Sequence, residues 1–277
     1  MIFLVDNGSV KVAAYENLRA IAKRLTDSLN REVVAAPLLH ADKISADQLG
    51  GEKVTLLEQA MEESYSKGTH SFHILPLFFG PSGALVDYLP RRLRKLREQY
   101  PKLQVRILNP LFVSNTDGGD VLTEILFQRI RGVRTKTQWD VFDVVLVDHG
   151  SPRKEVTEVR NALAELLGEK FENQTIPVTA ASMERRKGDE YAFNEPLLET
   201  ALASCSGERP VILSQLFLSP GRHAGPGGDI ESICKTAMEH NPALNIHPTD
   251  LVGNHPRLGE LLAKRWLERE TVPWLEL

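Results

Sequence analysis

The sequence contains an internal repeat, and this feature limits the possible folds more than any other. The segment Leu4–Ser9 (LVDNGS) is matched by Leu146–Ser151 (LVDHGS) at an offset of 142 residues (146 minus 4). Two more pairs of similar segments follow in the same order, 34–37 with 178–181 and 77–81 with 216–220. A tandem order kept across three matches is typical of two copies of one structural unit.

Short apolar runs alternate with longer amphipathic segments along the whole chain. We expect strands near 2–6, 32–37, 71–76, 104–108, 143–147, 176–181, 210–214 and 245–248. We expect helices near 11–29, 53–67, 85–99, 118–131, 153–170, 195–204, 228–240 and 256–269. Such alternation is typical of parallel sheets covered by helices. The predicted fold class is therefore α/β, with two tandem, similar units that each hold a four-stranded parallel sheet flanked by helices.

A polar stretch with little periodicity, Gly132–Gln138, separates the two repeats. Such stretches are typical of domain boundaries. We therefore predict an N-terminal half at residues 1–135 and a C-terminal half at residues 136–277.

Composition excludes several classes of protein. The 277 residues are 42% hydrophobic and 25% charged, as in soluble globular proteins, and the net charge of −4 argues against a nucleic-acid partner. No run approaches the ~20 apolar residues that span a bilayer, and the first residues lack a signal-peptide core. Cys205 and Cys234 form no CxxC pair and are interpreted as reduced thiols. We therefore expect a cytoplasmic protein with no membrane partner.

Three side chains suited to metal binding follow successive predicted strands of the second half. His149 follows the strand at 143–147, Glu184 follows the next strand, and His223 lies in a glycine-rich loop after the third. Ligands of open α/β sheets bind beyond the carboxyl ends of the strands, so we expect these side chains to share one crevice. Two imidazoles and a carboxylate suit Co²⁺, Fe²⁺, Ni²⁺ or Zn²⁺.

Each of these residues alone has a plainer interpretation, as a solvated loop histidine or a surface charge, and only their joint placement favours a site. The first half provides an internal control. Asn7 and Ala84 stand where the second half has His149 and His223, and His40 falls near the counterpart of Glu184. We therefore predict a single functional site, with a degenerate copy in the first half.

At these motifs the chain resembles the class II, ATP-independent tetrapyrrole chelatases, and most of all the CbiX-type sirohydrochlorin cobaltochelatases and ferrochelatases in their two-half form. The resemblance rests on His149-Gly150-Ser151, on Met183-Glu184, and on Leu216-Phe217-Leu218 followed by Gly221-Arg222-His223 and Asp229-Ile230. It implies a chelatase-like fold and a lyase that inserts Co²⁺ or Fe²⁺ into sirohydrochlorin or a related carboxylated tetrapyrrole, releasing two protons.

The resemblance also implies roles for individual residues. His149, Glu184 and His223 would be the catalytic and metal-binding residues, and the metal would be a substrate in siroheme or cobalamin biosynthesis. Ser151, Arg153, Arg185 and Arg222 would bind the carboxylated macrocycle, since arginine pairs with carboxylates. No nucleotide is expected, because the sequence has no Gly-x-x-x-x-Gly-Lys-Ser/Thr loop. A homodimer is left open.

Two other functions fit parts of the sequence. A non-catalytic metal or tetrapyrrole carrier would keep the fold and the ligands, and the degenerate first half favours it. The pair Arg222-His223 suggests a histidine phosphatase. In that family, however, Arg-His-Gly follows the first strand, whereas here Ala224 follows the pair and the pair lies late in the chain.

Overall fold

The computed structural model describes residues 1–171 and 176–277. Its strands are β1 (Ile2–Val5), β2 (Val33–Ala35), β3 (Ser71–Pro76), β4 (Gln104–Ile107), β5 (Asp143–Asp148), β6 (Val178–Ser182), β7 (Val211–Gln215) and β8 (Ile246–Pro248). Its α-helices are α1 (Val12–Leu29), α2 (Leu57–Ser66), α3 (Leu89–Gln99), α4 (Gly119–Thr137), α5 (Lys154–Phe171), α6 (Leu198–Ala203), α7 (Asp229–His240) and α8 (Pro256–Leu267). Short helices are η1 (Ala41–Lys43), η2 (Ala46–Leu49), the π-helical η3 (Ala84–Tyr88), η5 (Asp189–Asn194) and η6 (Glu268–Thr271).

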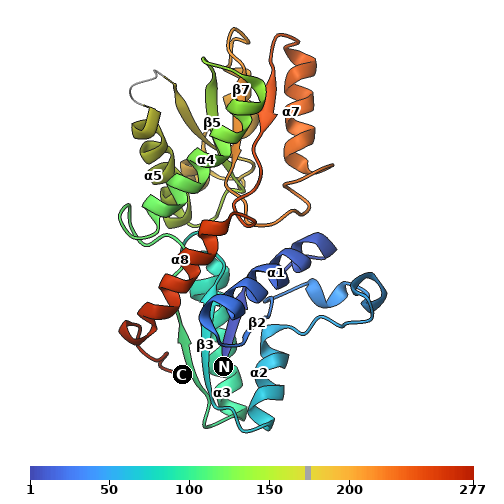
Figure 1. Ribbon diagram of the computed structural model, residues 1–277, viewed down its shortest axis with the longest axis vertical. Coiled ribbons are helices and arrows are strands. Elements are labelled where there is room, and N and C mark those ends of the chain that lie inside the picture. The colour runs from blue at the N-terminus through green and yellow to red at the C-terminus, as the bar shows by residue number, and fades with distance from the viewer. Residues whose placement is uncertain (172–175) are drawn as a thin grey trace. The chain divides into compact units, whose positions relative to one another are not determined.

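The strands form two sheets in which every pairing is parallel (Figure 1). The first sheet has the order β2-β1-β3-β4 and the second has the equivalent order β6-β5-β7-β8. The predicted fold class, with two four-stranded parallel sheets, is therefore confirmed. The order in which successive strands are added to the sheet reverses between β5 and β7. The carboxyl ends of these two neighbouring strands border the crevice where α/β proteins bind ligands.

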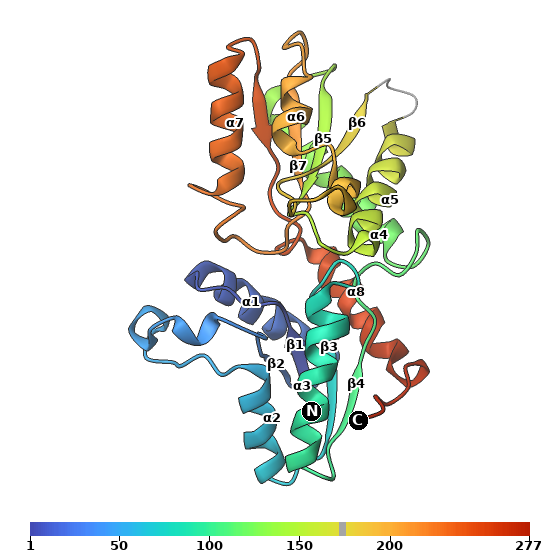
Figure 2. The same cartoon turned by 180° about the vertical axis from the view of Figure 1, so that it is seen from behind.

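The two central strands of the second sheet, β5 and β7, are buried on both faces. Val145, Val147 and Leu213 pack with the apolar side chains of α6 and α7. The alternating residues, such as Val144 and Leu146, are also fully buried, and α4 and α5 cover that side of the sheet (Figures 1 and 2). Near-continuous burial of this kind is expected for parallel strands and explains their unbroken apolar runs.

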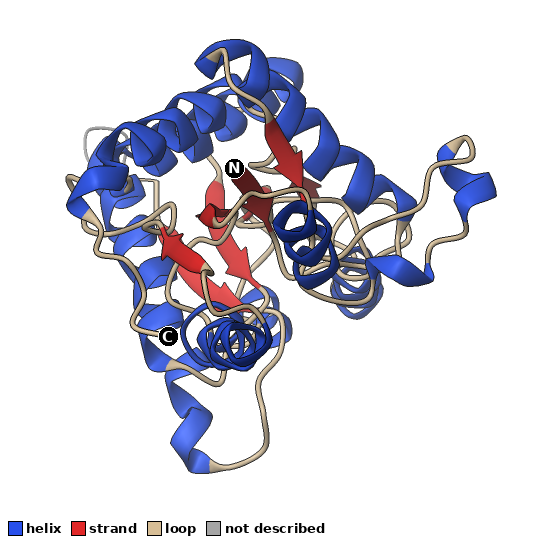
Figure 3. Ribbon diagram, turned by 90° about the horizontal axis from the view of Figure 1, so that it is seen from below, coloured by secondary structure: helices blue, strands red, loops and turns tan. Residues whose placement is uncertain are grey.

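The first sheet has a similar core. Phe3, Phe72 and Ile74 pack against buried side chains of α2 and α3, and Leu18 of α1 is fully buried. Helices lie outside the strands when the chain is seen from below (Figure 3). No described helix is both long enough and apolar enough to cross a membrane.

The chain divides into two compact units, Met1–Leu111 with Gly259–Leu277, and Phe112–Leu258. This division differs from the predicted halves, 1–135 and 136–277. Helix α4 packs on α5 and β7 and thus belongs with the second sheet. The C-terminal segment belongs with the first unit, because the buried Arg265 side chain donates to the carbonyl oxygens of Pro110 and Leu111 at 2.8 Å.

Several predicted boundaries shift. The polar stretch expected to be a linker continues α4 to Thr137, and the Thr135 and Thr137 hydroxyls donate to carbonyl oxygens of the preceding helical turn. The helix expected at 53–67 starts at Leu57, and the one expected at 195–204 starts at Leu198. The two cysteines are free thiols, Cys234 buried and Cys205 partly buried.

Candidate functional site

The turn that follows β5 determines how His149 is presented. The Asp148 carboxylate accepts a hydrogen bond from the Gly150 N–H at 3.1 Å, which closes the turn around His149. Gly150 has φ of 88°, and a Cβ there would lie 1.9 Å from the Glu184 carbonyl oxygen. Only glycine fits such a position. The turn thus holds the exposed His149 side chain beyond the carboxyl end of a buried strand.

The structure brings His149 and His223 together. Their ring centroids are 4.6 Å apart and the rings meet edge to face at 76°. His149 leaves β5 and His223 lies in the loop after β7, and β5 and β7 are hydrogen-bonded neighbours. The topology therefore brings together two residues that are 74 positions apart in the sequence (223 minus 149).

Each imidazole has a partner at Nδ1. The Nδ1 of His149 lies 3.0 Å from the Gly150 carbonyl oxygen, and the Nδ1 of His223 lies 2.7 Å from Oδ2 of Asp229. A proton on each Nδ1 satisfies these acceptors, and each Nε2 then keeps its lone pair. Histidines that bind metals are commonly oriented in this way, with the second ring nitrogen donating to a carbonyl or carboxylate.

Glu184 lies beside His149, with Oε1 3.5 Å from Nε2 of that ring, and its side chain is 60% exposed. Among the residues that the structure describes, no three or more His, Cys, Asp or Glu side chains are grouped closely enough to hold a metal ion. The predicted trio is therefore present as a close imidazole pair with a solvent-facing carboxylate next to one ring, and not as a three-ligand cage.

The predicted substrate-binding residues have unequal surroundings. Arg222 is 79% exposed, with only a loose contact of 3.7 Å to Asp229. Arg185 is held by Glu195 at 2.6 Å and by two carbonyl oxygens, so it braces its own loop. Arg153 contacts Glu155 at 3.2 Å. The Ser151 hydroxyl accepts from the Arg153 N–H at 3.0 Å, in the turn that precedes α5.

Residues 143–269, from the start of β5 to η6, match the CbiX family model. This stretch of the chain is similar to the CbiX family. No curated protein matches the sequence.

Solved structures extend the likeness to the whole chain. SirB from Bacillus subtilis with Fe³⁺ is 16% identical, with a TM-score of 0.68 over 97% of this chain and 94% of that chain. SirB from Bacillus subtilis subspecies spizizenii with cobalt is 15% identical, with a TM-score of 0.68 over 98% and 95%. CbiX, a terminal enzyme of siroheme biosynthesis in denitrifying bacteria, is 18% identical, with a TM-score of 0.61 over 96% and 97%. The chain thus has the chelatase-like fold of these proteins.

Beneath the CbiX-family motif lies a set of buried polar side chains that the sequence analysis did not find. Asp148, Arg160, Ser182 and Asn194 are all buried and contact one another directly. Burial raises the pKa of the Asp148 carboxyl, and the Ser182 hydroxyl, Arg160 and the Gly150 N–H act against this rise. One sequence signal was available, because Arg160 lies on the inward, otherwise apolar face of the predicted helix.

Asp229 belongs to the motifs that carry the resemblance, but no role was predicted for it. Its carboxylate contacts Nδ1 of His223 at 2.7 Å. It is the first residue of α7. The length of the glycine-rich loop before it hid this pairing, because sequence spacing does not show how a loop folds back on itself.

The first unit has the same turn as the second unit but lacks its histidine. Asp6 accepts from the Gly8 N–H at 3.0 Å, and a Cβ on Gly8 would meet the Leu39 carbonyl oxygen, as one on Gly150 would meet that of Glu184. Leu39 is therefore the counterpart of Glu184, one residue before His40, which the sequence comparison had placed nearby. Asn7 replaces the histidine of this turn.

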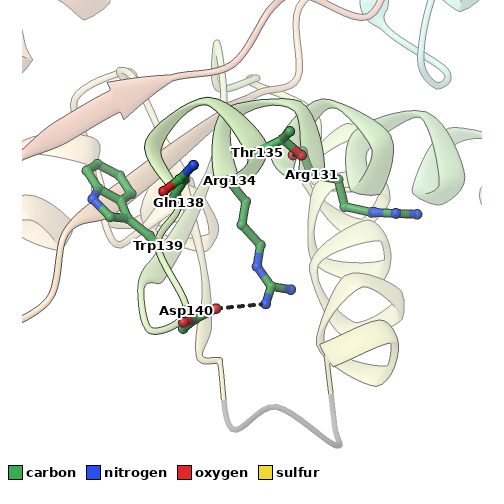
Figure 4. A pocket seen from close by; sticks show the side chains of 6 residues that line it. All are labelled: Arg131, Arg134, Thr135, Gln138, Trp139 and Asp140. Carbon is green, nitrogen blue, oxygen red and sulfur yellow. Dashed lines mark hydrogen bonds and ion pairs between the residues drawn. The ribbon is translucent and has the colours of Figure 1, made fainter.

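A shallow pocket of about 410 Å³ lies far from His149 and His223, between the end of α4 and the start of β5. Figure 4 shows that its side chains diverge, with Arg131 and Trp139 pointing to opposite sides and Arg134 paired with Asp140 at 3.4 Å. Because its charged groups do not converge, this pocket does not compete with the paired histidines as the candidate site.

Proposed function

We propose that the chain is an ATP-independent chelatase that inserts Co²⁺ or Fe²⁺ into sirohydrochlorin or a related carboxylated tetrapyrrole. One observation carries this proposal, the edge-to-face pair of His149 and His223 at 4.6 Å, each with Nδ1 backed by an acceptor. The match of residues 143–269 to the CbiX family model and the fold shared with SirB support it.

The proposed reaction needs two operations, and the positions of the two histidines and Glu184 support both. A tetrapyrrole takes up M²⁺ only as two pyrrole N–H protons leave, so metal delivery and proton removal belong at one place. His149 and His223 present Nε2 lone pairs to a divalent ion, and imidazole is a good ligand for Co²⁺ and Fe²⁺. The Glu184 carboxylate, 3.5 Å from the His149 ring, offsets the charge of the ion or accepts a departing proton.

The macrocycle would be held through its carboxylates. Arg222 is adjacent to His223, and its guanidinium is mostly exposed, which leaves its fork of N–H donors accessible. Arg185, by contrast, is occupied by Glu195 and loop carbonyls, so its proposed contribution is to shape the loop that carries Glu184. Arg222 is thus the main proposed contact, with Ser151 and Arg153 at the edge of the same turn.

The decisive experiment measures metal insertion by wild-type and variant chains. Purified protein is mixed with sirohydrochlorin and Co²⁺ or Fe²⁺, and the tetrapyrrole absorbance is followed against the spontaneous rate. We expect wild-type acceleration, its loss in His149→Ala and in His223→Ala, and no loss in Asn7→Ala, the matched change in the first unit. Near-wild-type insertion by the His149→Ala, His223→Ala double variant would refute the site.

A carrier function is the second candidate, and the degenerate first unit, with Asn7 and Ala84 in place of the two histidines, favours it. Tight binding of Co²⁺ or of the tetrapyrrole, with no acceleration over the spontaneous reaction, would establish the carrier and exclude the enzyme.

A further inference from the structure

The backbone on the C-terminal side of His149 is clamped by one buried side chain. Asn194, which is fully buried, accepts a hydrogen bond from the Ser151 N–H at 2.9 Å and donates one to the Ser151 carbonyl oxygen at 2.9 Å. The Thr157 hydroxyl of α5 donates to the same amide oxygen at 3.1 Å. Paired bonds of this kind fix both the position and the orientation of the Ser151 peptide groups.

The backbone on the N-terminal side is fixed by a second part of the same cluster. The Ser182 hydroxyl donates to Oδ1 of Asp148 at 2.7 Å, and that carboxylate accepts the Gly150 N–H. The Arg160 guanidinium donates to the Ser182 hydroxyl and to the Asn194 carbonyl oxygen, and lies 3.7 Å from Asp148. Strand β6, helix α5 and η5 therefore all brace the turn that carries His149.

The first unit shows that this turn forms without the bracing. Leu18 takes the place of Arg160 at the repeat offset of 142 (160 minus 18), and both side chains are fully buried. Strand register pairs Leu4 with Ala35 and Leu146 with Ala180, so Pro37 takes the place of Ser182. The first-unit turn still closes on Asp6. The extra polar groups therefore occur where the turn carries a histidine and are not needed to make the turn itself.

We infer that Arg160, Ser182 and Asn194, acting through Asp148 and Ser151, are positioning residues that hold His149 against His223. This inference rests on the proposed function, in which both imidazoles bind one divalent ion. A turn fixed on both sides keeps the Nε2 of His149 in place before the ion binds. Binding therefore costs less free energy for ordering the His149 side chain. Outer partners of metal ligands typically change metal affinity by about 10–100-fold when removed.

The test is the Co²⁺ affinity of Asn194→Ala at a temperature where circular dichroism shows the variant fully folded. We expect the dissociation constant to rise about tenfold or more. Thr157→Val removes only the hydroxyl that orients the Asn194 amide, so this variant should remain folded even if Asn194→Ala does not. We expect its Co²⁺ dissociation constant to rise about threefold, between the wild-type value and the 10–100-fold range.

Leu163→Ala is the matched control, because Leu163 is a fully buried apolar residue of the same helix. It lowers the melting temperature by forming a cavity, and we expect its Co²⁺ affinity to stay near the wild-type value. Unchanged affinity in both Thr157→Val and Asn194→Ala, or an equal loss in Leu163→Ala, would overturn the inference. So would a wild-type chain whose Co²⁺ binding does not depend on His149.

These outcomes are separable from failure of the proposed reaction. If the wild type binds Co²⁺ through His149 but does not accelerate insertion, the chelatase proposal fails. The positioning inference then stands or falls by the affinities alone.

Discussion

Asp6 and Asp148 occupy the same place in the two turns, but their surroundings differ. Each accepts a hydrogen bond from the glycine two residues later. Asp148 also has the Ser182 hydroxyl and Arg160 nearby, whereas Leu18 stands where Asp6 would need a cation. Burial raises the pKa of both carboxyls, that of Asp6 from 3.8 to about 6, and only at Asp148 do a hydroxyl and a guanidinium oppose the rise. The two equivalent carboxylates thus differ in the groups that stabilise their charge.

Asp6→Asn should stabilise the protein at neutral pH. Because the pKa of Asp6 is raised in the folded state, the folded state binds more protons than the unfolded chain between about pH 4 and pH 6. The free energy of unfolding therefore falls as pH rises through that window and stays low above it. About two pKa units correspond to at most about 3 kcal/mol at pH 7. Urea unfolding of Asp6→Asn at pH 4 and pH 7 should show a gain at pH 7 and almost none at pH 4.

Asp148→Asn is the matched change, and the opposite sign is expected. It would leave the buried Arg160 guanidinium without its compensating carboxylate, at a cost of about 3–5 kcal/mol. If both variants shifted stability in the same direction at pH 7, the proposed contrast between the two turns would be wrong.

Asp229 provides the second prediction at this scale. Its carboxylate contacts Nδ1 of His223 at 2.7 Å. Asp229→Asn keeps the shape of the side chain but removes its charge, so we expect Co²⁺ affinity to fall about tenfold. The free energy of unfolding should fall by less than about 1 kcal/mol, because a negative charge is lost at the start of α7. Isothermal titration calorimetry measures the affinity. Glu231→Gln, in the same helical turn, is the control and should bind Co²⁺ as the wild type does.

At the scale of elements, the turn between β5 and α5 is defined by a close backbone contact. Gly150→Ala would place a Cβ 1.9 Å from the Glu184 carbonyl oxygen at a φ of 88°. We expect a loss of stability on the order of 2 kcal/mol and weaker Co²⁺ binding, since the turn must move. Thermal unfolding and metal titration give the two readouts.

Gly8→Ala is the matched change in the first unit, where a Cβ would lie 1.8 Å from the Leu39 carbonyl oxygen. It should lower stability by a similar amount and leave Co²⁺ affinity unchanged. Equal losses of affinity in Gly8→Ala and Gly150→Ala would contradict the assignment of the site to the second unit.

At the scale of the whole molecule, duplication produced two turns but one candidate site. Asn7, Leu39 and Ala84 stand in the first unit where the second has His149, Glu184 and His223. We therefore expect one high-affinity Co²⁺ per chain, lost together with His149 or His223. Metal analysis after gel filtration measures this ratio. Two equivalent ions per chain, or one that persists in His149→Ala, would show that the first unit binds metal.

The local pattern of the sequence determined the elements, their parallel pairing and the repeat, because apolar periodicity records which residues a strand or helix buries. It also placed His149, Glu184 and His223 at successive strand ends. The sequence pattern did not show where the units divide. Helix α4 lies almost wholly before the predicted boundary yet packs with the second sheet, and the C-terminal segment lies after it yet belongs with the first unit, through contacts that periodicity does not record. The partners of the histidines were equally hidden.

Only the tertiary structure decided that Asp229 contacts His223, that Arg185 pairs with Glu195, and that Asn194 clamps Ser151. Each contact joins residues through a folded loop or between separate elements, and loop conformation has no sequence period to reveal it. The residue types available to the site were therefore readable from the chain, whereas their orientation depended on packing among β5, β6, β7 and α5.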